Sequence, residues 1–269
     1  MTLPAFKVPV DGPPLISAHR GAGNMAPENT LAAFEAALEK GATMIELDVH
    51  LSSDGVPMVI HDVTTARTTG KNGYVSEQAR AELQGLDAGS WFGPGHAGQR
   101  IPSFEDILDW AKDRVYLNVD VRNYPGLSSY DTGLTARAVT DAVARTGMLE
   151  QAVIQCLDHQ LAVEVRRRRP DAITGITFHG RAADLAGMAR TAGATLISGD
   201  AAFSTGEVVA GLHAAGIGWM TTAELRLPGL ADNPDLIAAS SRRLRDIGTD
   251  IIVTDDVDAT LAALREGTA

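Results

Sequence analysis

The chain has 269 residues, of which 45% are hydrophobic, and a formal net charge of −11. This length and apolar content can bury one substantial core, whereas the negative charge opposes non-specific binding to nucleic acid and to anionic membranes. The only cysteine, Cys156, excludes a disulfide within the chain and fits a small buried thiol.

The residues at the start of the chain include Pro4 and Pro9 but no continuous apolar run of the kind found in signal peptides. No stretch of 18 apolar residues suggests a membrane span. We therefore expect a cytoplasmic protein without stable membrane insertion. Nothing in the sequence indicates an oligomeric state.

The first predicted strand is a short apolar run that ends at His19 and Arg20, where Gly21 lets the backbone turn. An amphipathic helix follows, because apolar residues recur at helical spacing from Leu31 and Gly41 stands at the expected C-terminal cap. The chain therefore opens with a strand, a loop that carries reactive groups, and a helix.

The second predicted strand spans Met44–Val49, and the two-residue period of a strand puts Glu46 and Asp48 on one face. The dipeptide Asp54–Gly55 is typical of a two-residue hairpin turn. Counted outward from that turn, the register pairs Asp48 with His61. We therefore expect the hairpin to return a histidine to the two carboxylates.

The segment from about residue 64 to 100 is rich in Gly, Thr and small polar residues. A stretch of this length between core elements is usually a functional loop or a small insertion. It carries Trp91 and Phe92, which could contact a substrate from a cap or pack in the core.

Ser103 caps a predicted helix that runs to Lys112, and the next strand, Val115–Val121, puts Asp120 and Arg122 on one face with Asn118. Regular strand signals then alternate with helical stretches, near residues 152–155, 173–177, 195–198, 217–221 and 251–254.

The sequence predicts eight core strands if the second arm of the hairpin after the second strand is left out of the count. Eight strands separated mainly by helices favour a (β/α)₈ TIM barrel over an open doubly wound sheet. We expect one domain over residues 1–269, with an insertion over about 64–100. No Gly-rich nucleotide loop is present.

In such a barrel the C-terminal ends of the strands carry the active site. Six side chains are expected there: His19, Arg20, Glu46, Asp48, Asp120 and Arg122. The three carboxylates would form an oxygen-rich site for a hard cation such as Mg²⁺ or Ca²⁺. The alternative is that Glu46 and Asp48 pair with arginines in a buried network.

Two histidines, His19 and His61, could exchange protons near neutral pH at the same carboxylates. Arg20 could clamp a phosphate with its planar donor fork, or form a salt bridge to Glu46 or Glu28. The other histidines belong to no such group, and we interpret them as surface or packing residues: His50, His96, His159, His179 and His213.

Several short motifs follow one another in order: His19–Gly21, Pro27–Thr30, Glu46–Asp48, Asp54–Gly55, His61–Asp62, Arg67–Thr69 and Leu86–Trp91. Together they resemble the glycerophosphodiester phosphodiesterase family. The resemblance is dense from about residue 15 to 122. It is weaker afterwards, where Trp219 and Thr254–Asp255 resemble the late strands of the family.

The resemblance implies a metal-dependent enzyme that releases glycerol 3-phosphate and an alcohol such as choline or ethanolamine. A glycerol hydroxyl would attack phosphorus, the alcohol would leave, and water would open the cyclic phosphate. His19 and His61 match the general acid and base, Glu46 and Asp48 match metal ligands, and Arg20 matches the phosphate-binding arginine.

The sequence departs from the family at the strand that usually carries Glu-x-Lys, where it has Asp120 and Arg122. We expect Asp120 to be a metal ligand of shorter reach and Arg122 to bind substrate with a fork instead of an ammonium point charge. Trp219 is expected to contact substrate. Cys156–Leu157 replaces a Ser-Phe pair of the family.

The same barrel and site residues are compatible with other functions. A metal-dependent amidohydrolase would be expected to carry His-x-His on its first strand, and His19–Gly21 lacks that motif. A non-catalytic barrel that binds a phosphate ligand, or a phosphodiesterase of different substrate preference, would follow if the changes at Asp120 and Arg122 altered turnover. The presence of both histidines argues against loss of catalysis.

Overall fold

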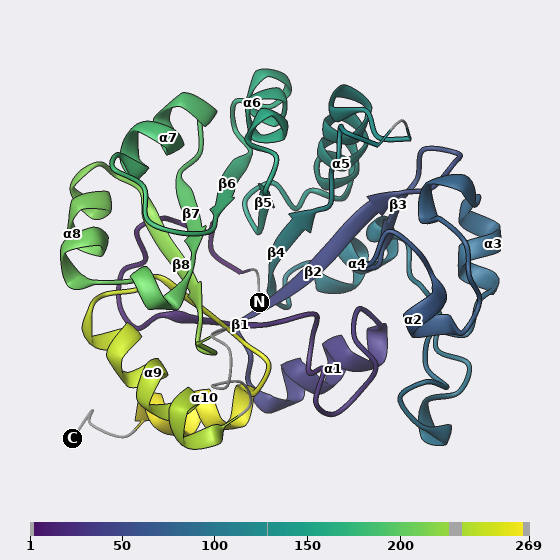
Figure 1. The fold of residues 1–269 in the computed structure, drawn as a ribbon, viewed down its shortest axis with the longest axis horizontal. Coiled ribbons are helices and arrows are strands. Elements are labelled where there is room, and N and C mark those ends of the chain that lie inside the picture. Colours follow the sequence, from purple (N-terminus) through teal and green to yellow (C-terminus); the bar gives the residue numbers. More distant parts are fainter. Residues whose placement is uncertain (1–2, 128, 226–232, 266–269) are drawn as a thin grey trace.

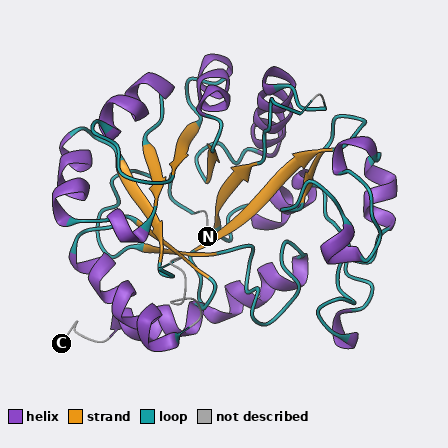
Figure 2. Cartoon of the chain, in the orientation of Figure 1, coloured by secondary structure: helices purple, strands orange, loops and turns teal. Residues whose placement is uncertain are grey.

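The computed structural model describes residues 3–127, 129–225 and 233–265. Its centre is a closed barrel of parallel strands surrounded by helices (Figures 1 and 2). The ring closes because β1 (Leu15–Ala18) pairs with both β2 (Met44–Leu51) and β9 (Ile251–Thr254). The predicted TIM barrel is confirmed.

Between β2 and β9 the strand neighbours follow chain order around the ring: β4 (Tyr116–Val121), β5 (Ala152–Cys156), β6 (Ile173–Phe178), β7 (Leu196–Gly199) and β8 (Gly218–Thr222). The outer layer holds α1 (Leu31–Lys40), α4 (Phe104–Ala111), α5 (Thr132–Thr146), α6 (His159–Arg168), α7 (Leu185–Ala192), α8 (Gly206–Ala214), α9 (Pro234–Asp246) and α10 (Val257–Arg265). In the described ranges, no helix is both long and apolar enough to span a membrane.

The interior of the barrel changes from apolar to polar along the strands. Near the strand starts, an apolar cluster forms a floor with Phe6 of the N-terminal segment: Met44, Val153, Leu196, Met220 and Ile251. Two residues further along, β2 carries Glu46 and β5 carries Gln155, and both line a pocket. The two-residue period thus places the polar layer directly above the floor.

The loop after β1 is held tightly against α1. Gly21 has a φ of +86°, and a Cβ on it would lie 2.8 Å from the carbonyl carbon of Ala33. Thr30 caps α1 by accepting a hydrogen bond from the Ala33 N–H, and Gly41 ends the helix with a φ of 96°. This packing fixes the loop that carries His19 and Arg20.

The hairpin after β2 differs from the prediction. Its second arm, β3 (Pro57–Val59), pairs Leu51 with Pro57 and Val49 with Val59. The Ser52 N–H also donates to the Val56 carbonyl at 2.9 Å, so the loop has three residues, 53–55, and Gly55 adopts the left-handed conformation with a φ of +76°. The predicted register is wrong by one residue: the N–H of Ile60, not a group of His61, donates to the Asp48 carbonyl at 3.0 Å.

The segment between β3 and α4 folds into short helices outside the ring, beyond β3 in Figure 1: α2 (Ala66–Thr69), η1 (Val75–Glu77), α3 (Arg80–Gly85) and η2 (Pro94–His96). It has a small core of its own that includes Val75 and Leu83. The division of the chain as a single domain over 1–269 stays a prediction.

Candidate active site

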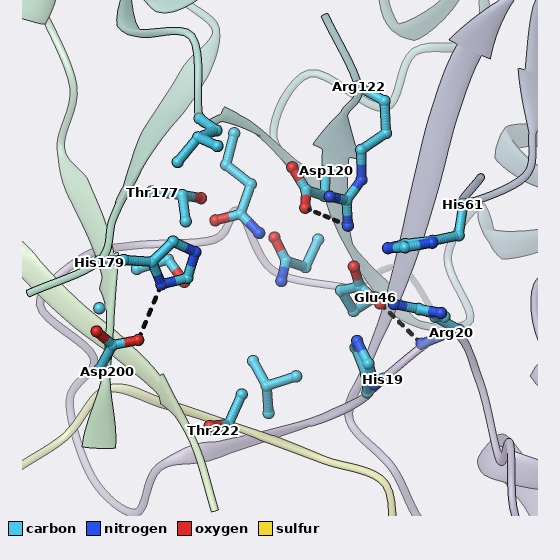
Figure 3. A pocket seen from close by; sticks show the side chains of 16 residues that line it. His19, Arg20, Glu46, His61, Asp120, Arg122, Thr177, His179, Asp200 and Thr222 are labelled. Atoms are coloured by element: carbon cyan, nitrogen blue, oxygen red, sulfur yellow. Dashed lines mark hydrogen bonds and ion pairs between the residues drawn. The ribbon is translucent and has the colours of Figure 1, made fainter. Parts of the chain in front are cut away.

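A polar pocket opens at the C-terminal ends of the barrel strands (Figure 3). Six of the predicted site residues line it: His19, Arg20, Glu46, His61, Asp120 and Arg122. Glu46 lies within β2 and Asp120 near the end of β4, and the other four follow β1, β3 and β4. The opposite wall comes from β5, β6 and β7.

Three carboxylates meet at this end of β2 and β4. Glu46, Asp48 and Asp120 each offer an oxygen within 4.8 Å of the others. The parallel register pairs Asp48 with Asp120, and the strand period puts Glu46 on the same face as Asp48. The spacing that predicted the cluster is therefore the spacing that builds it.

Arginine side chains pair with Asp48, as the alternative interpretation predicted, and with Asp120, whereas Glu46 accepts from the backbone N–H of Arg20. Arg122 donates from Nε to Asp48 Oδ1 at 2.8 Å, and its Nη2 lies 3.0 Å from Asp120 Oδ2. Arg20 Nε lies 3.4 Å from Asp48 Oδ2, and its backbone N–H donates to Glu46 Oε2 at 2.7 Å. Asp48 is fully buried, and Asn29 Nδ2 also donates to its Oδ2 at 2.8 Å.

The arginines stabilise the three carboxylates unequally. Burial opposes ionisation of Asp48, but the charges of Arg122 and Arg20 hold its pKa at about 2. Burial, together with the charge of Asp48, raises the pKa of Glu46 to about 7. Burial likewise raises the pKa of Asp120 to about 6, although Arg122 partly offsets the effect. Positive charge therefore compensates Glu46 and Asp120 less completely than Asp48.

This cluster fits a hard divalent cation. Carboxylate oxygens are the ligands such ions prefer, and the raised pKa values of Glu46 and Asp120 indicate a shortage of positive charge at these two groups. Both oxygens of Asp48 already accept hydrogen bonds from Arg122 and Asn29. Glu46 and Asp120, which line the pocket, are thus the more accessible ligands.

Each of the two predicted histidines is held by a carboxylate. The Nδ1 of His19 lies 2.6 Å from Asp255 Oδ1, and the Nδ1 of His61 lies 2.6 Å from Asp62 Oδ1. In a neutral ring, an Nδ1–H donated to a carboxylate makes Nε2 the basic nitrogen. Both rings point toward Glu46 and Arg20 in Figure 3.

The pKa values of these two histidines move in opposite directions. Burial lowers the pKa of His19, but Glu46 and Asp255 outweigh it, so the net shift is upward. Burial lowers the pKa of His61, and Asp48 and Asp62 only partly compensate.

A chain of ion pairs connects Arg20 to His61. Arg20 Nη1 donates to Glu28 Oε1 at 2.9 Å, and Arg67 Nη1 donates to Glu28 Oε2 at 2.7 Å. Arg67 Nε in turn donates to Asp62 Oδ2 at 2.7 Å, and Asp62 holds His61. No role was predicted for Arg67 or Asp62, although both stand in the motifs quoted for the family resemblance.

His50 supports His61 from behind. It is buried, its Nε2 lies 2.9 Å from the His61 carbonyl oxygen, and its Nδ1 lies 2.7 Å from the Tyr130 hydroxyl. Burial lowers the pKa of His50 to about 4, so the ring stays neutral. The packing role predicted for His50 agrees with this position.

His179 is the site residue that the sequence interpretation missed. It follows β6 directly and lines the pocket, and its Nδ1 lies 2.8 Å from Asp200 Oδ1 (Figure 3). Asp200 follows β7 and also lines the pocket. His179 is exposed, as its interpretation as a surface residue predicted, but that interpretation did not place it in the pocket. Its position directly after a predicted strand, like that of His19, was the available signal.

Trp219, for which a substrate contact was predicted, does not line this pocket. It is 2% exposed and packs in the core between the barrel and its helices, with Ile176 and Ile197. Its Nε1 donates to Ser204 Oγ at 2.9 Å. The strand period explains this outcome, because Met220 faces the barrel interior and Trp219 must face outward.

The predicted cap is likewise absent from the pocket lining among the described residues, because neither Trp91 nor Phe92 contributes to it. Trp91 is 42% exposed, packs against Phe92, and donates from Nε1 to the Ala88 carbonyl. The predicted buried thiol is confirmed: Cys156 is buried, and its sulfur lies 2.9 Å from the Val121 carbonyl.

Comparison with known proteins identifies related sequences and folds. Residues 19–259 match the Glycerophosphoryl diester phosphodiesterase family. The Glycerophosphodiester phosphodiesterase of Caldanaerobacter subterraneus subsp. tengcongensis is 35% identical over 169 residues, which cover 61% of this chain and 66% of that protein. Such alignments span roughly half to two thirds of the curated relatives.

Solved structures match over more of the chain. The glycerophosphodiester phosphodiesterase of Agrobacterium tumefaciens str. C58 has a TM-score of 0.75 and 28% identity, and the match covers 93% of this chain and 99% of that one. An Oleispira antarctica phosphodiesterase in complex with the product sn-glycerol-3-phosphate has a TM-score of 0.81 and 24% identity, with 94% and 97% covered. The second likeness concerns the fold alone.

Proposed function

Because the chain belongs to the glycerophosphoryl diester phosphodiesterase family, we propose that it hydrolyses glycerophosphodiesters to glycerol 3-phosphate and an alcohol. One observation carries the proposal: a single pocket brings together two histidine–carboxylate pairs, a cluster of three carboxylates and two arginines. These are the groups that proton transfer and phosphate binding require. The substrate would be a small molecule, and we propose a cytoplasmic location.

The proposal includes a divalent metal, Mg²⁺ or Ca²⁺, held by Glu46, Asp120 and Asp48. When bound, it would supply positive charge to the non-bridging phosphate oxygens. Arg20 and Arg122 line the same side of the pocket and would add hydrogen-bond donors to the phosphate. Arg122 would at the same time orient Asp48 through the bonds it already makes.

The two histidines would move the protons. As the glycerol hydroxyl forms its bond to phosphorus, one histidine takes the hydroxyl proton, and the other gives a proton to the alcohol oxygen as its bond to phosphorus breaks. Water then opens the cyclic phosphate with the roles reversed. Asp255 and Asp62 would fix the orientation of the two rings throughout.

The test is release of glycerol 3-phosphate from a panel of glycerophosphodiesters by the purified chain, with added Mg²⁺ or Ca²⁺ and with EDTA. We expect turnover that requires the divalent ion. Tight binding without turnover of any diester, under either ion, would contradict the proposed activity and favour the non-catalytic barrel. The variant His96→Ala, in the insertion, serves as the control for histidine substitutions in the pocket.

A further inference from the structure

The wall of the pocket opposite the catalytic groups offers hydrogen-bond acceptors without partners. Gln155 Oε1 and the Thr177 hydroxyl oxygen are buried and accept or donate no hydrogen bond within the described ranges. Asn118 Oδ1, on β4, is also buried and without a hydrogen-bond partner. All three residues line the pocket. Buried polar atoms in native proteins normally have partners, so such a group indicates a place for a ligand.

His179 adds an oriented acceptor to this wall. Its Nδ1 donates to Asp200 Oδ1 at 2.8 Å, which leaves Nε2 as the acceptor of the neutral ring. The ring stands over the pocket in Figure 3. The other oxygen of Asp200 accepts the Gly180 N–H at 2.8 Å. Both carboxylate oxygens are therefore engaged, and Asp200 acts through His179.

The same wall lacks the groups that would hold a quaternary ammonium. Within residues 3–127, 129–225 and 233–265, no Phe, Tyr or Trp lines the pocket, where Leu157 and Val253 are the apolar side chains. The residues outside these ranges include no Phe, Tyr or Trp either. Recognition of choline-like groups depends on aromatic faces. Choline also has no N–H or O–H to donate once it is esterified.

We propose that this wall, formed by Gln155, Thr177 and His179, binds the alcohol substituent of the diester and selects polyols over choline. The inference rests on the proposed function and names its substrate class. Each hydroxyl of a polyol such as glycerol can donate to one acceptor of the wall. A site built to receive hydroxyl groups rejects an analogue that lacks them, because the buried oxygens of Gln155 and Thr177 then stay unpaired.

A primary ammonium, as in ethanolamine, also donates hydrogen bonds, but it carries a positive charge and is best bound by a carboxylate. Among the described residues of this wall, the carboxylate is Asp200, which already accepts from His179 and Gly180. An ethanolamine headgroup would therefore gain less than a polyol and more than choline.

The test compares kcat/KM for glycerophosphoglycerol, glycerophosphoethanolamine and glycerophosphocholine, which share the glycerol 3-phosphate part. We expect the purified chain with added divalent ion to favour glycerophosphoglycerol over glycerophosphocholine by about 10-fold or more. His179→Ala should lower kcat/KM for glycerophosphoglycerol by roughly 10- to 100-fold and for glycerophosphocholine by less than about 3-fold. His179→Gln, which keeps an amide near the Nε2 position, should recover most of the loss.

Thr177→Val provides a second variant of nearly unchanged shape, with an expected loss of about 3- to 10-fold confined to glycerophosphoglycerol. His96→Ala should leave the substrate ratio unchanged. Equal losses with all three substrates, or a wild-type preference for glycerophosphocholine, would overturn the polyol subsite while leaving the proposed activity intact. Absence of turnover with every substrate would overturn the proposed function and this inference with it.

Discussion

The two sides of the pocket differ in how their polar groups are bonded before any ligand is present. On the β1, β2 and β4 side, carboxylates, arginines and histidines form a connected network, for example through Arg122, Asp48 and Asn29. On the β5, β6 and β7 side, the oxygens of Gln155 and Thr177 have no partner within the described part of the chain. The first side is largely preorganised, although Asn118 Oδ1 on β4 also lacks a partner, and under the proposed polyol subsite the second side would be completed by the ligand. In this proposal, the groups that carry out the reaction and the groups that recognise the alcohol substituent lie on different strands of one barrel.

The largest loss of activity is expected from a substitution on the β1, β2 and β4 side of the pocket. His61→Ala is expected to lower kcat by about 10² to 10⁴ for every glycerophosphodiester, because it removes one of the two proposed proton-transfer groups. The side chain of His61 is 28% exposed, so the thermal transition should change little. Steady-state kinetics and a thermal melt, with His96→Ala beside it, measure both. A variant that unfolds, or one that keeps full rate, would show that His61 has a different role.

Removal of the metal should come next. Dialysis against EDTA is expected to lower kcat by on the order of 10² or more for all substrates alike, since a bound cation contributes several kcal/mol of charge stabilisation. Titration with Mg²⁺ or Ca²⁺ should restore the rate in wild type and require more ion in Asp120→Asn. If chelation changed the substrate ratio instead of the common rate, the division between the two sides would fail.

The pH dependence of stability tests the charge shortage at Glu46. The folded pKa of about 7 exceeds the ordinary value of 4.5. The ionised carboxyl thus destabilises the metal-free fold above pH 7, and this penalty disappears as the pH falls toward 4.5. Glu46→Gln should therefore raise the free energy of unfolding in EDTA by about 3 kcal/mol at pH 8, at 1.36 kcal/mol per pKa unit.

The Glu46→Gln comparison is read from urea denaturation at pH 8 and pH 5. The difference between variant and wild type should shrink at pH 5, because wild-type Glu46 is then largely protonated. An equal difference at both values would mean that Glu46 is already neutralised. With saturating divalent ion the order should reverse, since glutamine is a poorer ligand.

The smallest effect should come from Trp219, outside both sides of the pocket. Trp219→Phe removes the bond to Ser204 Oγ and is expected to lower the free energy of unfolding by about 1 kcal/mol. KM and kcat should stay at wild-type values for all substrates. A rise in KM for any one of them would return Trp219 to the substrate-binding residues.

The barrel and its charged side were accessible from the sequence because they depend on local periodicity. Glu46 and Asp48 stand two residues apart on one strand, and His19 ends an apolar run, so their placement needs only the strand period and the barrel rule. The hairpin register was not accessible in the same way. It depends on Gly55 taking the left-handed conformation in a three-residue loop, and the dipeptide Asp54–Gly55 is compatible with both loop lengths.

The β5, β6 and β7 side of the pocket was not predicted from the sequence, because it depends on how neighbouring strands pair. His179 and Asp200 meet only because the parallel register sets Thr177 beside Ser198, which brings the two strand ends level. The outward orientation of Trp219 was not predicted for a related reason. The face of the strand on which it lies depends on where β8 starts, and the run of Trp, Met and two Thr residues has no alternation of apolar and polar residues that would show this. Contacts between residues that are distant in the sequence can be identified only once the fold is known.

The apolar floor of the barrel has a consequence for how products leave. Phe6 and Met44, with the rest of the floor, close the strand-start end, so substrate enters and both products depart at the strand C-termini. Under the proposed reaction, departure is then sequential. The alcohol, bound by neutral groups, would go first and admit the water that the second step consumes. Glycerol 3-phosphate, bound by charge, would go last and act as the stronger product inhibitor.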